Sequence, residues 1–144
     1  MKKVMFLTAF LAIAVLGYGQ DIRAGQVPSV VLNSFEKTYP KAAKVEWELQ
    51  GSQYNVEFKL GWVEHEVWMD AQGKIIKHKR EILESEIPDL VLKTIKRDFT
   101  SYHIDDCAVY EVEKQTFYKI ELKKQNVDRT VFIDSSGKIT DRIL

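Results

Sequence analysis

Two stretches of the sequence repeat each other and decide the fold: residues 67–75 read VWMDAQGKI, and residues 131–139 read VFIDSSGKI. Each stretch contains an Asp-x-x-Gly-Lys turn, in which glycine supplies the left-handed residue that closes a short hairpin loop. Residues two apart before the turn, such as Val67 and Met69, point to the same face of a strand. Each copy therefore predicts one strand, a tight turn and a second strand.

The repeat extends over most of the chain. Residues 54–58 match residues 118–122 at the same offset of 64, and residues 27–32 match residues 87–92 at an offset of 60. Ordered matches of this kind predict an internal duplication. Because the offset grows by four after the first segment, we expect the extra residues of the second copy to lie in a loop near residues 102–106.

Each copy begins with a helix. Pro28 and Pro88 suit the first helical turn, where a missing N–H group has no cost. Apolar residues then recur every four positions: they are Val31, Phe35 and Tyr39 in the first copy, and Val91, Ile95 and Phe99 in the second. One apolar stripe per helix predicts that each helix lies across a sheet, and Pro40 ends the first helix.

Strands follow each helix, with apolar residues at every second position. They are Val45, Trp47 and Leu49, then Tyr54, Val56, Phe58 and Leu60, then Val63, Val67 and Met69, and, in the second copy, Ala108, Tyr110 and Val112, then Tyr118, Ile120 and Leu122, then Val131 and Ile133. This period is typical of an antiparallel sheet that is covered on one face. The sequence thus predicts an α+β fold of two tandem units, residues 20–84 and 85–144. Each unit has one helix and about four antiparallel strands, and both helices pack on one face of the sheet.

Residues 1–19 have the pattern of a secretory signal peptide. Lys2 and Lys3 precede an apolar run at residues 4–16, and the small residues Gly17 and Gly19 fit the peptidase pocket. The run is too short to span a bilayer, which takes about 20 residues. We predict cleavage after Gly19 and a periplasmic or extracellular location, with an uncleaved membrane anchor as the alternative.

Composition narrows the class of partner. Cleavage removes two of the 21 basic side chains and leaves 19 against 21 acidic ones, a net charge of −2. This balance lacks the clustered positive surface that nucleic acids and anionic lipids need. Cys107 is the only cysteine, so an intramolecular disulfide is impossible, and we expect a small buried residue at the start of a strand. The mature chain is expected to bind no nucleic acid and to have no membrane span.

Several short motifs of the first unit together resemble the PepSY-like, β-lactamase-inhibitor-like proteins, exported bacterial proteins typical of Bacteroidetes that usually carry tandem units. The motifs are the Val-Pro helix start, Tyr39-Pro40 at the helix end, VEW at 45–47, YNVEF at 54–58 and DAQGK at 70–74. The resemblance covers residues 27–144. It implies helices on one face of an antiparallel sheet and a periplasmic or extracellular location. It supplies no catalytic residues, and a fold does not fix a function.

Glu64-His65-Glu66 has the residue types of a metal or acid–base site. On a strand, Glu64 and Glu66 point one way and His65 the other, so the three side chains do not converge on one ion. His65 falls in line with Val63 and Val67. This favours a half-buried histidine whose ring is hydrogen-bonded.

His103, Asp105, Asp106 and Cys107 form a second candidate cluster. A thiol beside an imidazole could be an activated nucleophile, and the two aspartates could join a metal site. However, the spacing matches no zinc pattern, and the first copy has only alanines in that region. The alternative is a polar loop before a strand that begins with cysteine. We assign no catalytic residue, no metal ligand and no cofactor.

Aromatic residues supply the remaining functional signal. If Val67 and Met69 face the helices, the helix-free face carries Trp62, Glu64, Glu66 and Trp68 and, in the second unit, Phe117, Lys119, Glu121, Thr130 and Phe132. Large aromatic side chains on an uncovered face often mark partner sites, and Trp often dominates binding energy. Alternatively, the two tryptophans cover each other, pack on the second unit or lie under the terminal strand.

The leading hypothesis is an exported, non-catalytic module that binds a protein or peptide through the helix-free sheet face. The predicted partner-binding residues are Trp62, Trp68, Phe132, Glu64, Glu66 and Lys119. Hydrolase inhibition is one form this binding could take. A small-ligand or metal-binding envelope sensor centred on residues 103–107 is the alternative, and an enzyme comes third. Either edge of the predicted sheet could pair with another chain, so the sequence leaves the oligomeric state open.

Overall fold

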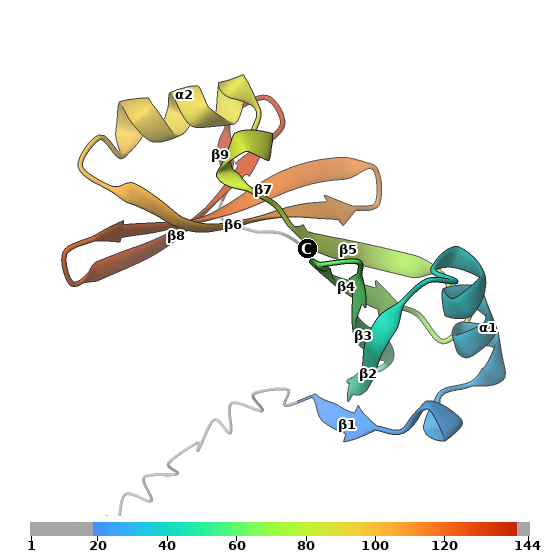
Figure 1. The fold of residues 1–144 in the computed structure, drawn as a ribbon. Helices are drawn as coiled ribbons and strands as arrows, with labels where there is room; N and C mark the ends of the chain where they lie inside the picture. Colours follow the sequence, from blue (N-terminus) through green and yellow to red (C-terminus); the bar gives the residue numbers. More distant parts are fainter. Residues whose placement is uncertain (1–18, 141–144) are drawn as a thin grey trace, which may run out of the picture.

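A computed structural model describes residues 19–140, so most of the predicted signal peptide and the last four residues lie outside the described range. The described residues form one nine-stranded antiparallel sheet in which neighbours in sequence pair with each other. Within residues 19–140, both α-helices lie on the same face of this sheet, and no helix of this range lies on the other, helix-free face (Figure 1). The predicted α+β fold with two tandem units is thus confirmed.

The two units have the same order of elements. The first unit consists of the 3-10 helix η1 (Ala24–Gln26), α1 (Ser29–Thr38), β2 (Ala43–Gln50), β3 (Gln53–Leu60), β4 (Val63–Met69) and β5 (Ile75–Glu81). The second consists of η2 (Glu84–Glu86), α2 (Asp89–Asp98), β6 (His103–Val112), β7 (Gln115–Lys124), β8 (Val127–Asp134) and β9 (Ile139–Thr140). A short strand that was not predicted, β1 (Gln20–Ile22), adds to the edge at β2. Strands β5 and β6 join the units.

Each helix covers its own apolar core on the shared face. Helix α1 buries Val31 and Phe35, and α2 buries Val91 and Ile95, as the apolar stripes predict. Under α1 lie Trp47, Val56, Phe58, Val67 and Met69; under α2 lie Cys107, Val109, Ile120, Leu122 and Ile133. The helix-covered face is therefore apolar in both units, but its buried residues form two separate clusters.

The repeated glycine turn is the point at which each helix docks. Ser34 Oγ of α1 donates a hydrogen bond to the carbonyl oxygen of Gly73 at 2.7 Å, and Thr94 Oγ1 of α2 donates one to Gly137 at 2.6 Å. Both glycines have positive φ, +79° and +86°, and a Cβ atom on either would lie 2.8 Å from a helix carbonyl oxygen. The turn thus requires glycine twice over, for backbone conformation and for space.

The extra residues of the second unit lengthen a hairpin. β6 and β7 each have 10 residues, whereas β2 and β3 each have 8. Ala43 pairs with Lys59, and 60 and 64 residues later His103 pairs with Lys123, so the offset changes only at the hairpin tip. The predicted insertion near residues 102–106 was wrong. Sequence matching misses this because two residues added to each strand preserve both the pairing and the faces.

Candidate functional site

Trp68 lies on the helix-free face, as predicted. It pairs with Asn55 on β3 and Lys77 on β5, opposite to the buried neighbours Val67 and Met69. Its indole N–H donates a hydrogen bond to Gln50 Oε1 at 3.1 Å, and Lys77 Nζ lies 4.0 Å from the ring centre. These neighbours leave Trp68 only 8% exposed. The ring is therefore held in a fixed position and is not a mobile surface group.

Trp62 does not share the face of Trp68. It lies in the two-residue turn between β3 and β4, next to Gly61 with φ of +62°, and 98% of the residue is exposed. Strand alternation does not carry through a hairpin turn, because the chain reverses there. The alternative in which the two tryptophans cover each other is thereby wrong.

Phe132 lies on the helix-free face of β8 opposite Lys119. Its ring meets Tyr110 edge-on, with the ring centres 6.1 Å apart and the planes at 80°. Tyr110 pairs with Lys79 and Phe117, so it also faces away from the helices. We call Trp68, Tyr110, Phe117 and Phe132 the aromatic strip. The lysines of β5 separate its first member from the other three.

The side chains of β6 reverse the predicted assignment of faces. Ala108, Tyr110 and Val112 were expected to face the helices, but Cys107 and Val109 occupy the core beneath α2. Ala108 and Val112 are nevertheless only 2% and 7% exposed. Because β6 is a central strand with apolar residues on both faces, its alternation carries no signal for which face the helix covers.

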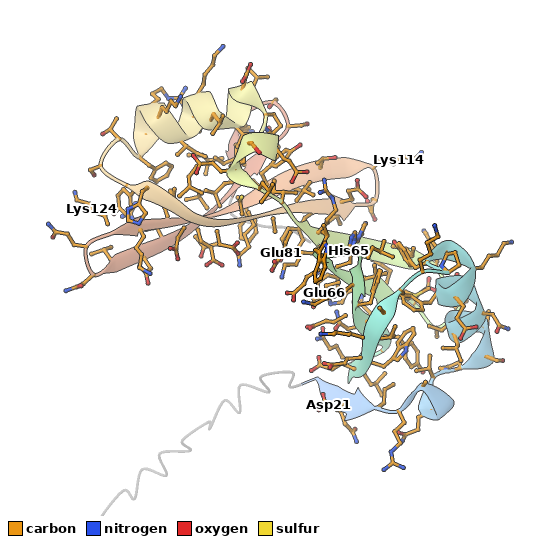
Figure 2. All side chains as sticks on the ribbon, viewed as in Figure 1. Asp21, His65, Glu66, Glu81, Lys114 and Lys124 are labelled. Carbon is orange, nitrogen blue, oxygen red and sulfur yellow. The ribbon has the colours of Figure 1, made fainter. Side chains whose placement is uncertain are left out.

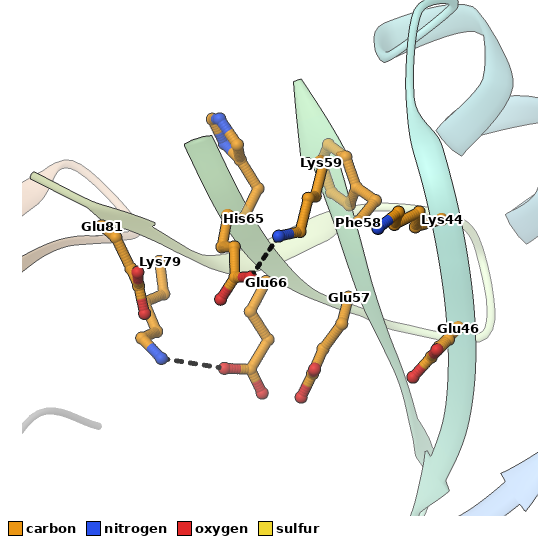
Figure 3. A pocket seen from close by; sticks show the side chains of 10 residues that line it. Lys44, Glu46, Glu57, Phe58, Lys59, His65, Glu66, Lys79 and Glu81 are labelled. Carbon is orange, nitrogen blue, oxygen red and sulfur yellow. Dashed lines mark ion pairs between the residues drawn. The ribbon is translucent and has the colours of Figure 1, made fainter. Parts of the chain in front are cut away.

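The predicted charged residues already have partners within the molecule. Lys59 Nζ lies 2.6 Å from Glu64, and Lys79 Nζ lies 3.7 Å from Glu66, which also accepts a hydrogen bond from Asn55 at 2.9 Å. The pairs involving Glu64 and Glu66 are drawn in Figure 3. Lys119 contacts Glu121 on its own strand. These residues form cross-strand or same-strand pairs, which any partner must either keep or replace.

A row of carboxylates crosses the first unit. Glu46, Glu57 and Glu66 pair directly across β2, β3 and β4, and their side chains lie next to one another in Figure 3. Burial and the neighbouring Glu66 raise the pKa of Glu57. The helix-free face is therefore acidic in the first unit, whereas the second unit carries three members of the aromatic strip.

His65 and Glu66 point to opposite sides of the sheet, as predicted (Figures 2 and 3). His65 is 9% exposed on the helix-covered face, and its Nδ1 lies 2.9 Å from Nε2 of His78. The ring is thus buried and hydrogen-bonded. Sequence reasoning did not identify His78, which stands in the polar run KHKR at residues 77–80.

The cluster at residues 103–107 lies on β6, with a register shift between Ile104 and Asp106, and not in a loop. His103 and Asp106 are exposed, whereas Cys107 is 4% exposed and its thiol donates a hydrogen bond to the Ile82 carbonyl at 3.1 Å. Burial, with Asp106 nearby, raises the pKa of Cys107 to about 11. Within residues 19–140, no group of three or more His, Cys, Asp or Glu side chains is placed to hold a metal. In the same range, no helix is long and apolar enough to cross a bilayer.

Solved structures with the same fold come from Bacteroides. A DUF2874 family protein from Bacteroides uniformis is 20% identical, with a TM-score of 0.71 over 78% of this chain and 85% of that chain. A Bacteroides eggerthii chain described as "putative periplasmic proteins" is 19% identical, with a TM-score of 0.72 over 78% and 85%. A BLIP-like protein from Bacteroides fragilis is 21% identical, with a TM-score of 0.66 over 77% and 81%. These likenesses show the fold alone.

None of the curated proteins matches the chain. The model of one family, described as "Putative beta-lactamase-inhibitor-like, PepSY-like", matches residues 16–77 and again residues 52–141. The two matches overlap at residues 52–77, and together they span most of the sequence. The chain therefore belongs to the PepSY-like, beta-lactamase-inhibitor-like family.

Proposed function

We propose that this protein is an exported, non-catalytic module that binds a protein or peptide through its helix-free sheet face. The observation that carries the proposal is the aromatic strip. Phe117, Phe132 and Tyr110 are half-buried on a face that no helix covers. Rigid aromatic side chains supply a large contact area at low entropic cost, which is the usual property of binding anchors.

The location rests on the sequence and on the relatives. The first nineteen residues have the signal-peptide pattern, and one structural relative is described as periplasmic. We propose cleavage after Gly19 and a periplasmic or extracellular location for the mature chain. We also propose that the mature chain divides into one repeat at residues 20–84 and a second at residues 85–144.

A non-catalytic role fits the chemistry of the polar residues. Glu64, Glu66 and Lys119 of the helix-free face each form an ion pair within the molecule. The thiol of Cys107 is buried, and its raised pKa keeps it protonated at neutral pH. Hydrolase inhibition is one form that binding could take, since a relative is described as BLIP-like. The residues of this chain do not specify the target.

The proposed anchor residues lie at two different places, on the sheet face and at a hairpin tip. We propose Trp68 and Phe132 as fixed anchors on the face, with Glu66 and Lys119 beside them. Trp62 belongs to the same proposal as an edge anchor, because a fully exposed indole at a hairpin tip is available to a partner. Glu64 and its ion pair with Lys59 lie next to that tip.

Site-specific photo-cross-linking in a native envelope extract tests the proposal. A photoreactive phenylalanine analogue at position 132 should trap one partner, whereas the same group at Leu90, which is 50% exposed on α2, should not. Unlabelled wild-type protein and Leu90→Ala should both compete for the cross-link. Phe132→Ala should compete poorly while its circular dichroism spectrum stays native. Equal trapping from both positions, or undiminished competition by Phe132→Ala, would overturn the assignment of the face.

A further inference from the structure

Two histidines meet on the helix-covered face, next to the C-terminal end of α1. His65 of β4 and His78 of β5 are joined by a ring-nitrogen contact of 2.9 Å, and their rings stack with centres 5.2 Å apart and planes at 14°. Phe58 stacks on His65 at 5.3 Å, and Tyr39, the residue at which α1 ends, leans on His78 at 5.9 Å. The contact is thus confined by aromatic rings on two sides.

The chemistry of this contact limits its proton content. Glu111 Oε2 lies 3.4 Å from Nδ1 of His78, so the favoured arrangement has His78 donate Nδ1–H to Glu111 and accept Nδ1–H of His65 at Nε2. If one of the two rings is protonated, the contact survives, because the other, neutral ring still offers a lone pair that accepts the hydrogen bond. If both rings are protonated, the contact is lost, because each ring then presents an N–H group to the other.

The surrounding charges come from several elements. Arg80 of β5 pairs with His65 and is itself paired with Glu86 of η2 at 3.1 Å. Glu111 of β6 faces His78, and Glu113 and Lys114 of the following turn line the same hollow, as does Tyr39 at the end of α1. From β3 the contact comes from Phe58, which carries no charge. Burial lowers the pKa of both histidines, and Arg80 acts in the same direction, whereas Glu111 opposes the shift at His78.

The same two strands carry contacts of the proposed binding face on their other side. Glu66 follows His65 on β4 and pairs with Lys79, which follows His78 on β5. Lys77, which precedes His78, covers the ring of Trp68. Both contacts bridge β4 and β5, so a change in the spacing of these strands alters the two faces together.

We propose that the His65–His78 contact is an acid-sensitive latch between β4 and β5, which couples the helix-covered face to the Trp68 region of the binding face. At neutral pH the Nδ1–H group of His65 donates a hydrogen bond to Nε2 of His78, and this bond links the side chains of β4 and β5. In acid the second imidazolium breaks the contact and places three cations, His65, His78 and Arg80, on adjacent positions. Its consequence for partner binding rests on the proposed function, but the coupling itself does not.

The chain provides its own control, because it has three histidines. The third, His103, is exposed at the start of β6, away from this contact. Nuclear magnetic resonance of purified protein without a partner, over about pH 8 to 5, can follow the imidazole signals and the Trp68 indole N–H signal together. The indole proton is a direct reporter, since it is hydrogen-bonded to Gln50 on the binding face.

We expect the Trp68 indole signal to shift along the titration of His65 and His78 in the wild type and in His103→Gln. In the doubly substituted His65→Phe, His78→Phe protein, which keeps the ring stack, the indole signal should stay constant. A constant signal in the wild type, or an equal shift in the double variant, would overturn the latch. If the double variant does not fold, the comparison of wild type with His78→Asn decides in the same way. Because no partner is present, the outcome is independent of whether cross-linking supports the binding face.

Discussion

Nζ of Lys77 lies 4.0 Å from the centre of the Trp68 ring, so a cation covers an indole on the face that no helix covers. Such a contact contributes about 0.5–1 kcal/mol when exposed and more when it is desolvated. Together with the hydrogen bond to Gln50, it explains how a tryptophan on an uncovered face is only 8% exposed. We therefore expect Trp68 to contribute to stability in addition to its proposed role as an anchor.

This dual role predicts different outcomes for the two tryptophans. Trp68→Ala should lower the free energy of unfolding by about 3 kcal/mol, because it leaves a cavity at a buried ring. Trp62→Ala should change it by less than about 0.5 kcal/mol, because that ring is exposed at a turn. Urea unfolding of the two variants measures both values. Similar losses for the two variants would show that the difference in burial does not control stability.

The glycine turns predict a second difference. Gly73→Ala should destabilise the first unit by about 1–3 kcal/mol, because alanine would need a positive φ and its Cβ would approach the Val30 carbonyl. Gly25→Ala is the matched control, since nothing lies within 4 Å of its added Cβ. Thermal unfolding followed by circular dichroism compares them. A Gly73→Ala protein as stable as Gly25→Ala would contradict the docking role of the turn.

Stability should also depend on pH through the buried histidines. Their folded-state pKa values lie below the ordinary value of 6.5, so the unfolded chain binds more protons once the pH falls below that value. The histidine contribution is therefore fully present above about pH 6.5 and is lost as the pH falls toward the folded-state values. The urea concentration at the unfolding midpoint should therefore decrease as the pH is lowered below about 6.5, in the wild type and in His103→Gln.

The same midpoints should fall less in the His65→Phe, His78→Phe double variant. Carboxylates such as Asp134, whose pKa is lowered by Ser136 and the turn backbone, act in a separate window. The stability that Asp134 contributes is lost only as the pH falls below about its ordinary pKa value of 3.8. A wild type and a double variant with parallel pH profiles above that region would contradict the histidine assignment.

Cys107 should be unreactive in the folded protein. The residue is 4% exposed, and burial raises its pKa to about 11. At neutral pH a reagent therefore has little access to the sulfur, and little of the thiol is in the reactive thiolate form. A thiol reagent should label it slowly in buffer and rapidly in concentrated urea, where the chain is unfolded. Rapid labelling of the native protein would contradict the buried position.

The duplicated stretch made the fold predictable, because each glycine turn fixed a hairpin and each alternation fixed a face. The face of Trp68 followed correctly from Val67 and Met69. Alternation failed where its physical basis ends: Trp62 stands in a turn, and β6 is apolar on both faces. His78 was missed for another reason. Its partners His65 and Glu111 lie 13 and 33 residues away in sequence, and a polar run gives no sign that one of its side chains is buried.

The longer β6–β7 hairpin has a consequence for how the two copies are joined. Its added length supplies Glu111 and Val112, which pair with His78 and Lys77 of the first copy. Lys114 marks its tip in Figure 2. Without these two residue pairs, the pairing of β5 with β6 would be shorter, and His78 would have no carboxylate opposite it. The second copy thus carries two residue pairs that the first copy lacks, and these residues extend its pairing with the first copy.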